Sequence, residues 1–199
     1  MNDEFFITDL NRGWIEIITG SMFSGKTEEL IRRIKRAELA NQKTQIFKHI
    51  LDTRYAKDKI VSHNKTSIKS LQVRNSREIL SYINDVRVVG IDEGQFFDNG
   101  LIEVVEFLAN SGIRVIVAGL DMDYRGEPFG PMPELMARSE FVTKLHAICM
   151  RCGNLAIYSH RKIQSKELVL PGTDQEYEPL CRTCFYKVNE KNNRYKHYD

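Results

Sequence analysis

One eight-residue segment constrains the fold of this chain more than any other feature. It reads Gly20-Ser21-Met22-Phe23-Ser24-Gly25-Lys26-Thr27 and fits G-x-x-x-x-G-K-[ST], the phosphate-binding loop. Its glycines let successive backbone N–H groups turn toward phosphate oxygens, and the N-terminus of a following helix adds positive potential there. Lys26 can reach the β- and γ-phosphates of ATP, and the Thr27 hydroxyl can ligate Mg²⁺. The loop therefore predicts nucleotide binding.

Apolar strand patterns alternate with helical patterns on both sides of this loop. Runs rich in β-branched residues predict strands at 15–19, 45–50, 86–91 and 113–120, with a weaker run at 141–149. Apolar residues at helical spacing predict helices at 27–40 and 101–110, the second with Asp98 as N-cap and Gly112 just past its end. Strands separated by helices favour a parallel sheet with right-handed crossovers. We expect an α/β fold of the P-loop, RecA-like kind, with a mostly parallel sheet and helices on both faces.

A buried strand followed by two acidic residues supplies a second half for a nucleotide site. The run at 88–91 delivers Asp92, which can hold the Mg²⁺ shell, and places Glu93 close to the γ-phosphate. An acidic pair after a strand is more often a surface turn, and it gains weight here because a phosphate loop precedes it. Glu93 could polarise a water, as in an ATPase, or accept the proton of a substrate hydroxyl, as in a kinase. The motifs alone leave both open.

The four cysteines form two Cys-x-x-Cys pairs, Cys149 with Cys152 and Cys181 with Cys184. Two thiolate pairs at this spacing can hold one tetrahedral zinc ion, and four thiolates leave no open coordination position, so the zinc would be structural. Two separate redox-active pairs are the competing interpretation. We expect the intervening segment, with short arms at 156–161 and 166–170, to form a loop whose two ends the zinc holds together.

Composition suggests how the chain is divided and where it acts. We expect a nucleotide-binding domain at 1–145, a zinc and lasso domain without a helical period at 146–188, and a polar tail at 189–199. The lasso is the loop between the two cysteine pairs. With a net charge of +2, the chain lacks the basic surface typical of nucleic-acid binding. No apolar run is long enough for a membrane span, and the acidic N-terminus is unlike a signal peptide, so we expect a cytoplasmic protein without a membrane partner.

Taken together, these residues resemble the P-loop, zinc-containing (cellular type II) thymidine kinase family over roughly residues 13–187. The resemblance is carried by the phosphate loop and the paired cysteines with Tyr177, and by three further segments: Asp52-Thr53-Arg54, Asp92-Glu93-Gly94-Gln95-Phe96-Phe97 and residues 119–131 (GLDMDYRGEPFGP). It implies an enzyme of deoxynucleoside salvage and DNA precursor synthesis that moves the γ-phosphate of ATP to the 5′-hydroxyl of thymidine, with Mg²⁺ and a structural Zn²⁺. It also implies a homotetramer and feedback inhibition by thymidine triphosphate.

The resemblance also assigns individual residues. It implies that Glu93 is the general base, that Asp92 and Gln95 order metal and phosphates, and that Asp52, Thr53 and Arg54 approach ATP. The substrate residues that it implies are Met22, Phe96, Leu120, Tyr124, Ser159 and Tyr177 around the base or sugar, and Leu168, Val169, Leu170, Pro171 and Gly172 in the lasso. Pro171 departs from the family pattern, because it has no backbone N–H to donate to a base edge.

Two functions of other classes remain as alternatives at this point. A P-loop ATPase with a zinc ribbon would act with nucleic acid, although the chain has no basic stripe. A regulatory nucleotide-binding module would use zinc for assembly alone and would leave Glu93 without a catalytic task. Dependence of ATP consumption on thymidine, on DNA or on neither separates the three.

Overall fold

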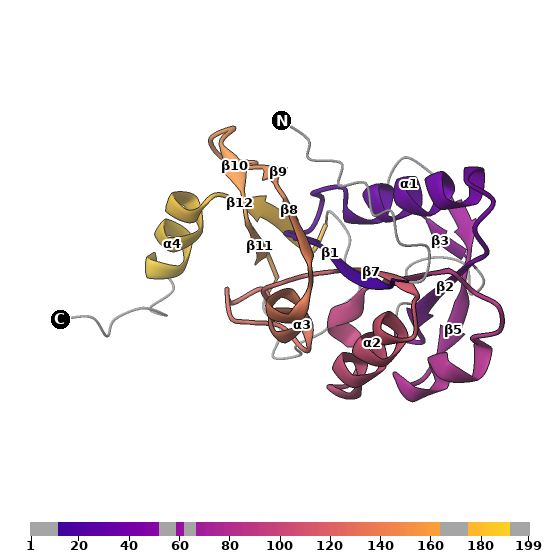
Figure 1. Cartoon of the computed structure of the whole chain (residues 1–199). Coiled ribbons are helices and arrows are strands. Elements are labelled where there is room, and N and C mark those ends of the chain that lie inside the picture. The colour runs from indigo at the N-terminus through magenta and orange to yellow at the C-terminus, as the bar shows by residue number, and fades with distance from the viewer. Residues whose placement is uncertain (1–11, 52–58, 62–66, 164–174, 192–199) are drawn as a thin grey trace.

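The phosphate loop projects from a parallel β-sheet in the computed structural model, which describes residues 12–51, 59–61, 67–163 and 175–191 (Figure 1). The sheet has six strands in the order β5-β2-β6-β7-β1-β8, and every neighbouring pair is parallel. The strands are β1 (Trp14–Gly20), β2 (Thr44–His49), β5 (Leu71–Val73), β6 (Val88–Asp92), β7 (Arg114–Gly119) and β8 (Phe141–Leu145). The predicted α/β fold of the RecA-like P-loop kind is confirmed.

Helices cover both faces of this sheet. Helix α1 (Lys26–Leu39) follows the phosphate loop and buries Leu30, Ile31, Ile34 and Ala37, the positions that its helical spacing predicts. Helix α2 (Gly100–Asn110) lies on the opposite face, where Asp98 accepts a hydrogen bond from the Gly100 N–H at 2.9 Å. Helix α3 (Met132–Arg138) and the 3₁₀ helices η1 (Arg77–Tyr82) and η2 (Gly94–Phe96) complete this part of the chain.

The inner strands β1, β2, β6 and β7 are buried on both faces, which explains why they read as continuous apolar runs. On one face, Ile18, Ile46 and Ile116 pack with the buried side chains of α1. On the other face, the apolar side of α2 packs on Ile17, Val89 and Val115. Each fully buried side chain of this size contributes about 1.5–3 kcal/mol, so the two layers hold the strand ends that carry the site in fixed positions.

A smaller module follows the sheet and contains the cysteines. It comprises two antiparallel strand pairs, β9 (Ala147–Ile148) with β10 (Leu155–Ala156) and β11 (Tyr158–Arg161) with β12 (Tyr177–Leu180), followed by helix α4 (Arg182–Lys191). Tyr158 stacks on Phe185 with ring centroids 4.2 Å apart, at the centre of the small apolar core of the module. Figure 1 shows this module beside the β8 edge of the sheet.

Three details of the module differ from the prediction. The run at 141–149 forms two strands, β8 and β9, which belong to different sheets. Helix α4 was not predicted, and it continues to Lys191, inside the range 189–199 that was assigned to a polar tail. The arm at 156–161 pairs with β12, while the expected second arm at 166–170 lies outside the described residues.

One further strand pair lies outside the six-stranded sheet. Strands β3 (Lys59–Val61) and β4 (Ser67–Lys69) form a short antiparallel ribbon that the sequence did not predict. Within the part of the chain that the structure describes, no helix combines the length and apolar character needed to span a bilayer.

Candidate functional site

The phosphate loop joins the end of β1 to the start of α1 through backbone conformations that few residues adopt. Gly20 and Gly25 have φ angles of 135° and 87°, and Phe23, which is not a glycine, has a φ of 64°. A Cβ atom on Gly20 would lie 2.1 Å from the Leu145 carbonyl oxygen, so the position cannot hold a side chain. The left-handed residues turn the chain back on itself, as an anion-binding loop requires.

Two side chains of the loop are suited to phosphate oxygens. Lys26 is buried at the start of α1, and its Nζ donates to the Ser21 carbonyl oxygen at 2.8 Å, which keeps the ammonium over the loop. The buried Ser24 hydroxyl has no hydrogen-bond partner among the described residues. A buried hydroxyl without a partner is costly, and a phosphate oxygen would satisfy it. The loop therefore fits the phosphates of ATP.

Asp92, at the end of β6, faces the phosphate loop across the sheet edge. The Thr27 hydroxyl lies 3.3 and 3.5 Å from the two carboxylate oxygens of Asp92. A hydroxyl and a carboxylate are the oxygen ligands that Mg²⁺ accepts in phosphate-loop sites. The predicted pair is thus brought together, and the donor set fits a Mg²⁺ ion held with nucleotide phosphates.

Glu93 directly follows Asp92 in a left-handed conformation, with a φ of 54°, and is buried. The Gln95 side-chain N–H donates to the Glu93 carboxylate, and the Gln95 side-chain oxygen Oε1 accepts from the Leu120 N–H at 2.9 Å. Gln95 thereby ties Glu93 to the end of β7. Non-glycine residues in this conformation persist where surrounding contacts hold them, and they concentrate at functional sites.

The residues expected around the base or sugar approach the loop from two directions. Ser159, on β11, accepts a hydrogen bond from the Met22 N–H at 2.9 Å, so the cysteine-containing module contacts the phosphate loop directly. Leu120 follows β7, and Phe96 lies in η2. The Phe96 ring meets the Phe129 ring edge-on, with the ring centroids 6.1 Å apart. The structure brings these residues to the carboxyl ends of the strands, where parallel sheets bind ligands.

Arg161 is a residue of this site that the sequence did not single out. Its guanidinium lies 3.7 Å from the centre of the Tyr124 ring and donates from Nε and Nη2 to the Tyr177 hydroxyl at 3.1 and 2.7 Å. It thereby joins two of the expected substrate residues. Alternation along β11 places it on the same side as Ser159, which is the one sequence signal that could have found it.

Two predicted groups of site residues cannot be placed. Asp52, Thr53 and Arg54, expected near the nucleotide, and residues 168–172, expected in the lasso, lie outside the described residues. Their roles stay predictions.

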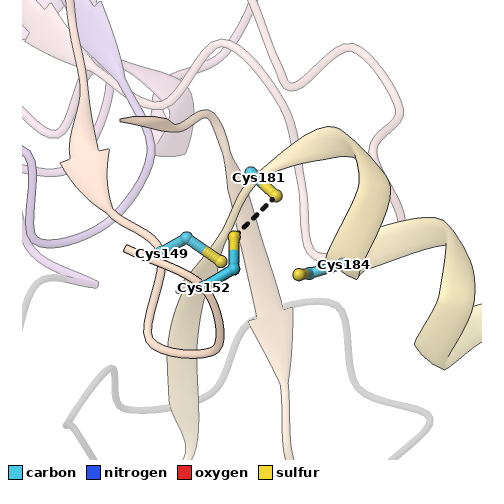
Figure 2. Close-up of side chains that lie close together, drawn as sticks. All are labelled: Cys149, Cys152, Cys181 and Cys184. Atoms are coloured by element: carbon cyan, nitrogen blue, oxygen red, sulfur yellow. Dashed lines mark hydrogen bonds between the residues drawn. The ribbon is translucent and has the colours of Figure 1, made fainter. Parts of the chain in front are cut away.

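The four cysteines converge on one point, which excludes two separate redox sites. Their sulfur atoms all lie within 4.8 Å of one another, and none forms a disulfide. Figure 2 shows Cys149 and Cys152 reaching from the loop after β9 toward Cys181 and Cys184 at the start of α4. Zinc–sulfur bonds of about 2.3 Å in a tetrahedron place sulfur atoms roughly 3.8 Å apart, so the cluster fits a zinc ion.

Thiol ionisation in the cluster also fits a bound cation. Burial raises the pKa of Cys149, but hydrogen bonds from the backbone N–H groups of Cys181 and Arg151 outweigh it and lower the pKa to about 6. A hydrogen bond with the Cys152 thiol raises the pKa of Cys184 to about 12. Four thiols this close cannot all ionise unless a cation lies among them, and a divalent metal ion removes the conflict.

Fold and site together define the class of this chain. A parallel sheet whose first strand runs into a phosphate loop, with a carboxylate from another strand against the loop threonine, is a nucleotide-binding domain of the P-loop class. Here that domain carries a four-cysteine module of its own.

Comparison with known proteins identifies the family within this class. The family described as "Thymidine kinase" matches residues 13–185. The chain is 57% identical over 177 residues to a thymidine kinase of Bacteroides thetaiotaomicron, an alignment that covers 89% of each chain. It is 56% identical over 180 residues to a thymidine kinase of Porphyromonas gingivalis, covering 90% of this chain and 88% of that relative. The chain belongs to the thymidine kinase family, as its sequence predicted.

A solved structure with a weaker likeness is the X-ray structure of the Legionella pneumophila ATPase DotB. The match has a TM-score of 0.39 and 17% sequence identity, and it covers 64% of this chain and 34% of that one.

Proposed function

We propose that this chain is an ATP-dependent thymidine kinase, which transfers the γ-phosphate of ATP to the 5′-hydroxyl of thymidine in deoxynucleoside salvage. Family membership supports the reaction. The observation that supports its chemistry is the buried Glu93, oriented by Gln95 and adjacent to the carboxylate that meets Thr27 of the phosphate loop. A carboxylate held beside the phosphate site is placed to receive a proton from an attacking hydroxyl.

On the nucleotide side, the residues of the chain bind and orient. The backbone N–H groups of the loop and the Lys26 ammonium hold the phosphates of ATP, with Asp52, Thr53 and Arg54 approaching the same nucleotide. Thr27 and Asp92 would hold the Mg²⁺ ion, which when bound neutralises charge that develops on the γ-phosphate oxygens. Glu93 accepts the proton of the 5′-hydroxyl as the oxygen attacks phosphorus, and Gln95 keeps its carboxylate in place.

On the thymidine side, Met22, Ser159 and Tyr177 enclose the base or sugar together with Phe96, Leu120 and Tyr124. Residues 168–172 contribute backbone groups to the base edge. Arg161 supports this wall, because its guanidinium fixes the Tyr124 and Tyr177 rings relative to each other. Zn²⁺ at the four cysteines has a structural role, since all four positions of a tetrahedral ion are filled by thiolates.

The division of the chain into domains is also part of this proposal. We assign nucleotide binding to residues 1–145 and the zinc and lasso region to 146–188. A homotetramer, feedback inhibition by thymidine triphosphate and a cytoplasmic location follow from the family resemblance and belong to the proposal.

Turnover of Glu93→Gln tests the reaction and the base together. Phosphorylation of thymidine by ATP is measured, with deoxycytidine and single-stranded DNA as control additions. The substitution keeps the shape of the side chain and removes its basicity, so we expect kcat to fall by about 10²–10⁴-fold with a much smaller change in the KM for ATP. Glu103→Gln, at an exposed position of α2, is the matched control and should behave like the wild type.

Each adverse result has a separate meaning. Near-normal turnover of Glu93→Gln would show that another group accepts the proton. Wild-type, zinc-loaded protein that folds but forms no product from thymidine would overturn the proposed function, and ATP consumption stimulated by DNA would then favour the ATPase alternative.

A further inference from the structure

A lysine lies completely buried in the sheet that carries the site. Lys48, on β2, has a relative exposure of 0%, the same as the neighbouring core residue Phe47. Lysine is among the residues least often buried, because an ammonium that leaves water needs a compensating negative charge. No role in the function proposed above uses this residue, so its surroundings must explain its position.

The register of the sheet shows which way Lys48 points. Strands β2 and β6 are parallel, with Ile46 opposite Gly90 and Lys48 opposite Asp92. Gly90 faces α1, since a Cβ atom there would lie 3.0 Å from Cδ1 of Ile34. Side chains alternate along a strand, and register partners on parallel strands share a face, so Lys48 and Asp92 both face α1.

The residue after Lys48 confirms this alternation. The ring centroids of His49 and Phe97 lie 5.1 Å apart, and Phe97 belongs to the apolar cluster on the α2 face of the sheet. His49 therefore points away from α1, and Lys48 points toward it.

The face that Lys48 shares with Asp92 is the face of the phosphate loop. Thr27, in the first turn of α1, reaches the Asp92 carboxylate from that side at 3.3 Å. Neighbouring strands of a sheet lie about 4.8 Å apart, so Lys48 is adjacent to Asp92 at the strand ends beneath the loop. The Lys26 ammonium, by contrast, lies over the loop itself, on the Ser21 carbonyl oxygen.

Negative charge is concentrated at this edge of the sheet. Asp92 and Glu93 are consecutive and both buried, with relative exposures of 4% and 7%. Two adjacent buried carboxylates repel each other and attract cations strongly, so a divalent metal ion could bind them without a nucleotide. A fixed positive charge at the register partner of Asp92, on the neighbouring strand, offsets both effects.

We propose that Lys48 is a positioning residue of the kinase site, whose buried ammonium orients Asp92 toward Thr27 and weakens the binding of a divalent cation in the absence of nucleotide. The metal ion then binds tightly only together with the phosphates of ATP. This inference rests on the proposed function for its effect on turnover, whereas its effects on metal binding and stability can be measured without the reaction.

The test compares Lys48→Met, which keeps the length of the side chain and removes its charge, with Lys48→Arg, which keeps the charge. Lys35→Met, at an exposed position of α1, is the matched control. For Lys48→Met we expect kcat to fall on the order of tenfold, with the KM for thymidine unchanged, and Mn²⁺ alone to bind on the order of tenfold more tightly by electron paramagnetic resonance. Lys48→Arg should restore the weak Mn²⁺ binding, and Lys35→Met should match the wild type.

A double-mutant cycle keeps the inference testable if Lys48→Met folds poorly. When Lys48 is removed, the Asp92 charge stays buried without its neighbour, so adding Asp92→Asn should recover part of the lost thermal stability. Strictly additive losses in Tm would overturn the proposal, as would Mn²⁺ affinity and turnover equal to the wild type. A wild type inactive on thymidine would overturn the proposed function instead, while the Mn²⁺ and Tm measurements would still report on Lys48.

Discussion

Glu16 and Glu93 are both buried glutamates, and their surroundings give them different tasks. Glu16, on β1, accepts hydrogen bonds from Trp14 Nε1 at 2.7 Å, Arg33 Nη1 at 2.7 Å and Arg114 Nε at 2.6 Å. A carboxylate held by two arginines stays ionised and serves the structure. Glu93 receives a neutral amide donor from Gln95, which orients the carboxylate without supplying a positive charge. A carboxylate oriented in this way suits the proton-accepting role that we propose for Glu93.

The environment of Glu16 predicts how stability depends on pH. Burial raises the pKa of Glu16, but the hydrogen bonds and charge of Arg114, with Trp14 and Arg33, outweigh it and hold the pKa below its usual 4.5. A lowered pKa in the folded state gives stability that is present above pH 4.5 and is lost as the pH falls through the folded value. Glu16→Gln should therefore cost about 3 kcal/mol near neutral pH, because it removes the carboxylate that pairs with the partly buried Arg114 and one of the two that pair with Arg33, which keeps Glu29.

Urea unfolding of wild type and Glu16→Gln at several pH values measures this effect. We expect the difference in the free energy of unfolding to shrink as the solution is acidified below the usual pKa of a glutamate. Glu103→Gln on the surface of α2 should show a small difference at every pH. A difference that stayed constant down to acid pH would show that Glu16 contributes by packing and not by its charge.

At the scale of secondary-structure elements, β11 and the end of β10 hold the phosphate loop in place. Ser159 accepts from the Met22 N–H at 2.9 Å, and the Ser21 hydroxyl donates to the Ala156 carbonyl oxygen at 3.3 Å. Ser159→Ala leaves the Met22 amide without its acceptor, at a cost of about 1–3 kcal/mol. If the contact positions the loop for phosphate, the KM for ATP should rise by roughly tenfold.

Two further variants sharpen this prediction. Ser159→Thr retains the hydroxyl and should restore the KM for ATP, whereas Ser139→Ala, whose hydroxyl donates to the Met136 carbonyl oxygen at 3.1 Å near α3, should leave it unchanged. An unaltered KM for ATP in Ser159→Ala would mean that β11 does not position the loop, and that any defect in thymidine use arises on the substrate side.

The elements that sequence predicted correctly are those whose signals are local. The apolar runs of β1, β2, β6 and β7 and the helical spacing in α1 lie within the segments that fold. Gly112 lies just past the end of α2 as expected, with a φ of 85°, whereas the N-cap is Asn99 and not Asp98. Asp98 lies one residue earlier, and its carboxylate accepts a hydrogen bond from the Gly100 N–H at the start of the helix. The approach of Thr27 to Asp92 followed from one topological rule, that parallel strands bring their carboxyl ends to the same edge.

The elements that were missed depend on distant contacts. Helix α4 has apolar contacts at Phe185 and Val188, and Cys181 lies just before its first residue. This helical spacing is short, and it begins with a metal-ligand candidate. Its folding partner is Tyr158, more than twenty residues away, so local propensity alone favours it weakly. The packing of Arg161 on the Tyr124 ring likewise joins separate segments, and no pattern within either segment predicts it.

At the scale of the whole molecule, the sheet and the cysteine module differ in what stabilises them. The sheet buries apolar residues on both faces, whereas the module has a small core around Tyr158 and Phe185. Regions of roughly 40 residues or fewer usually need a metal ion or disulfides to stay folded. The four cysteines do not form disulfides, so we expect the stability of the module to depend on a metal ion held by them.

Removal of zinc should therefore unfold the module and spare the sheet. In protein treated with a chelator, we expect thymidine phosphorylation to be lost, because β11 and its contact with the phosphate loop belong to the module. Far-UV circular dichroism should retain most of its helical signal, since α1 and α2 pack on the sheet.

A thiol reagent should react with all four cysteines only after zinc release, and added Zn²⁺ should restore both protection and activity. Full activity in protein shown by metal analysis to lack zinc would contradict this dependence, and Cys152→Ser, which removes one of the four ligands, should reproduce the chelator effect without any reagent.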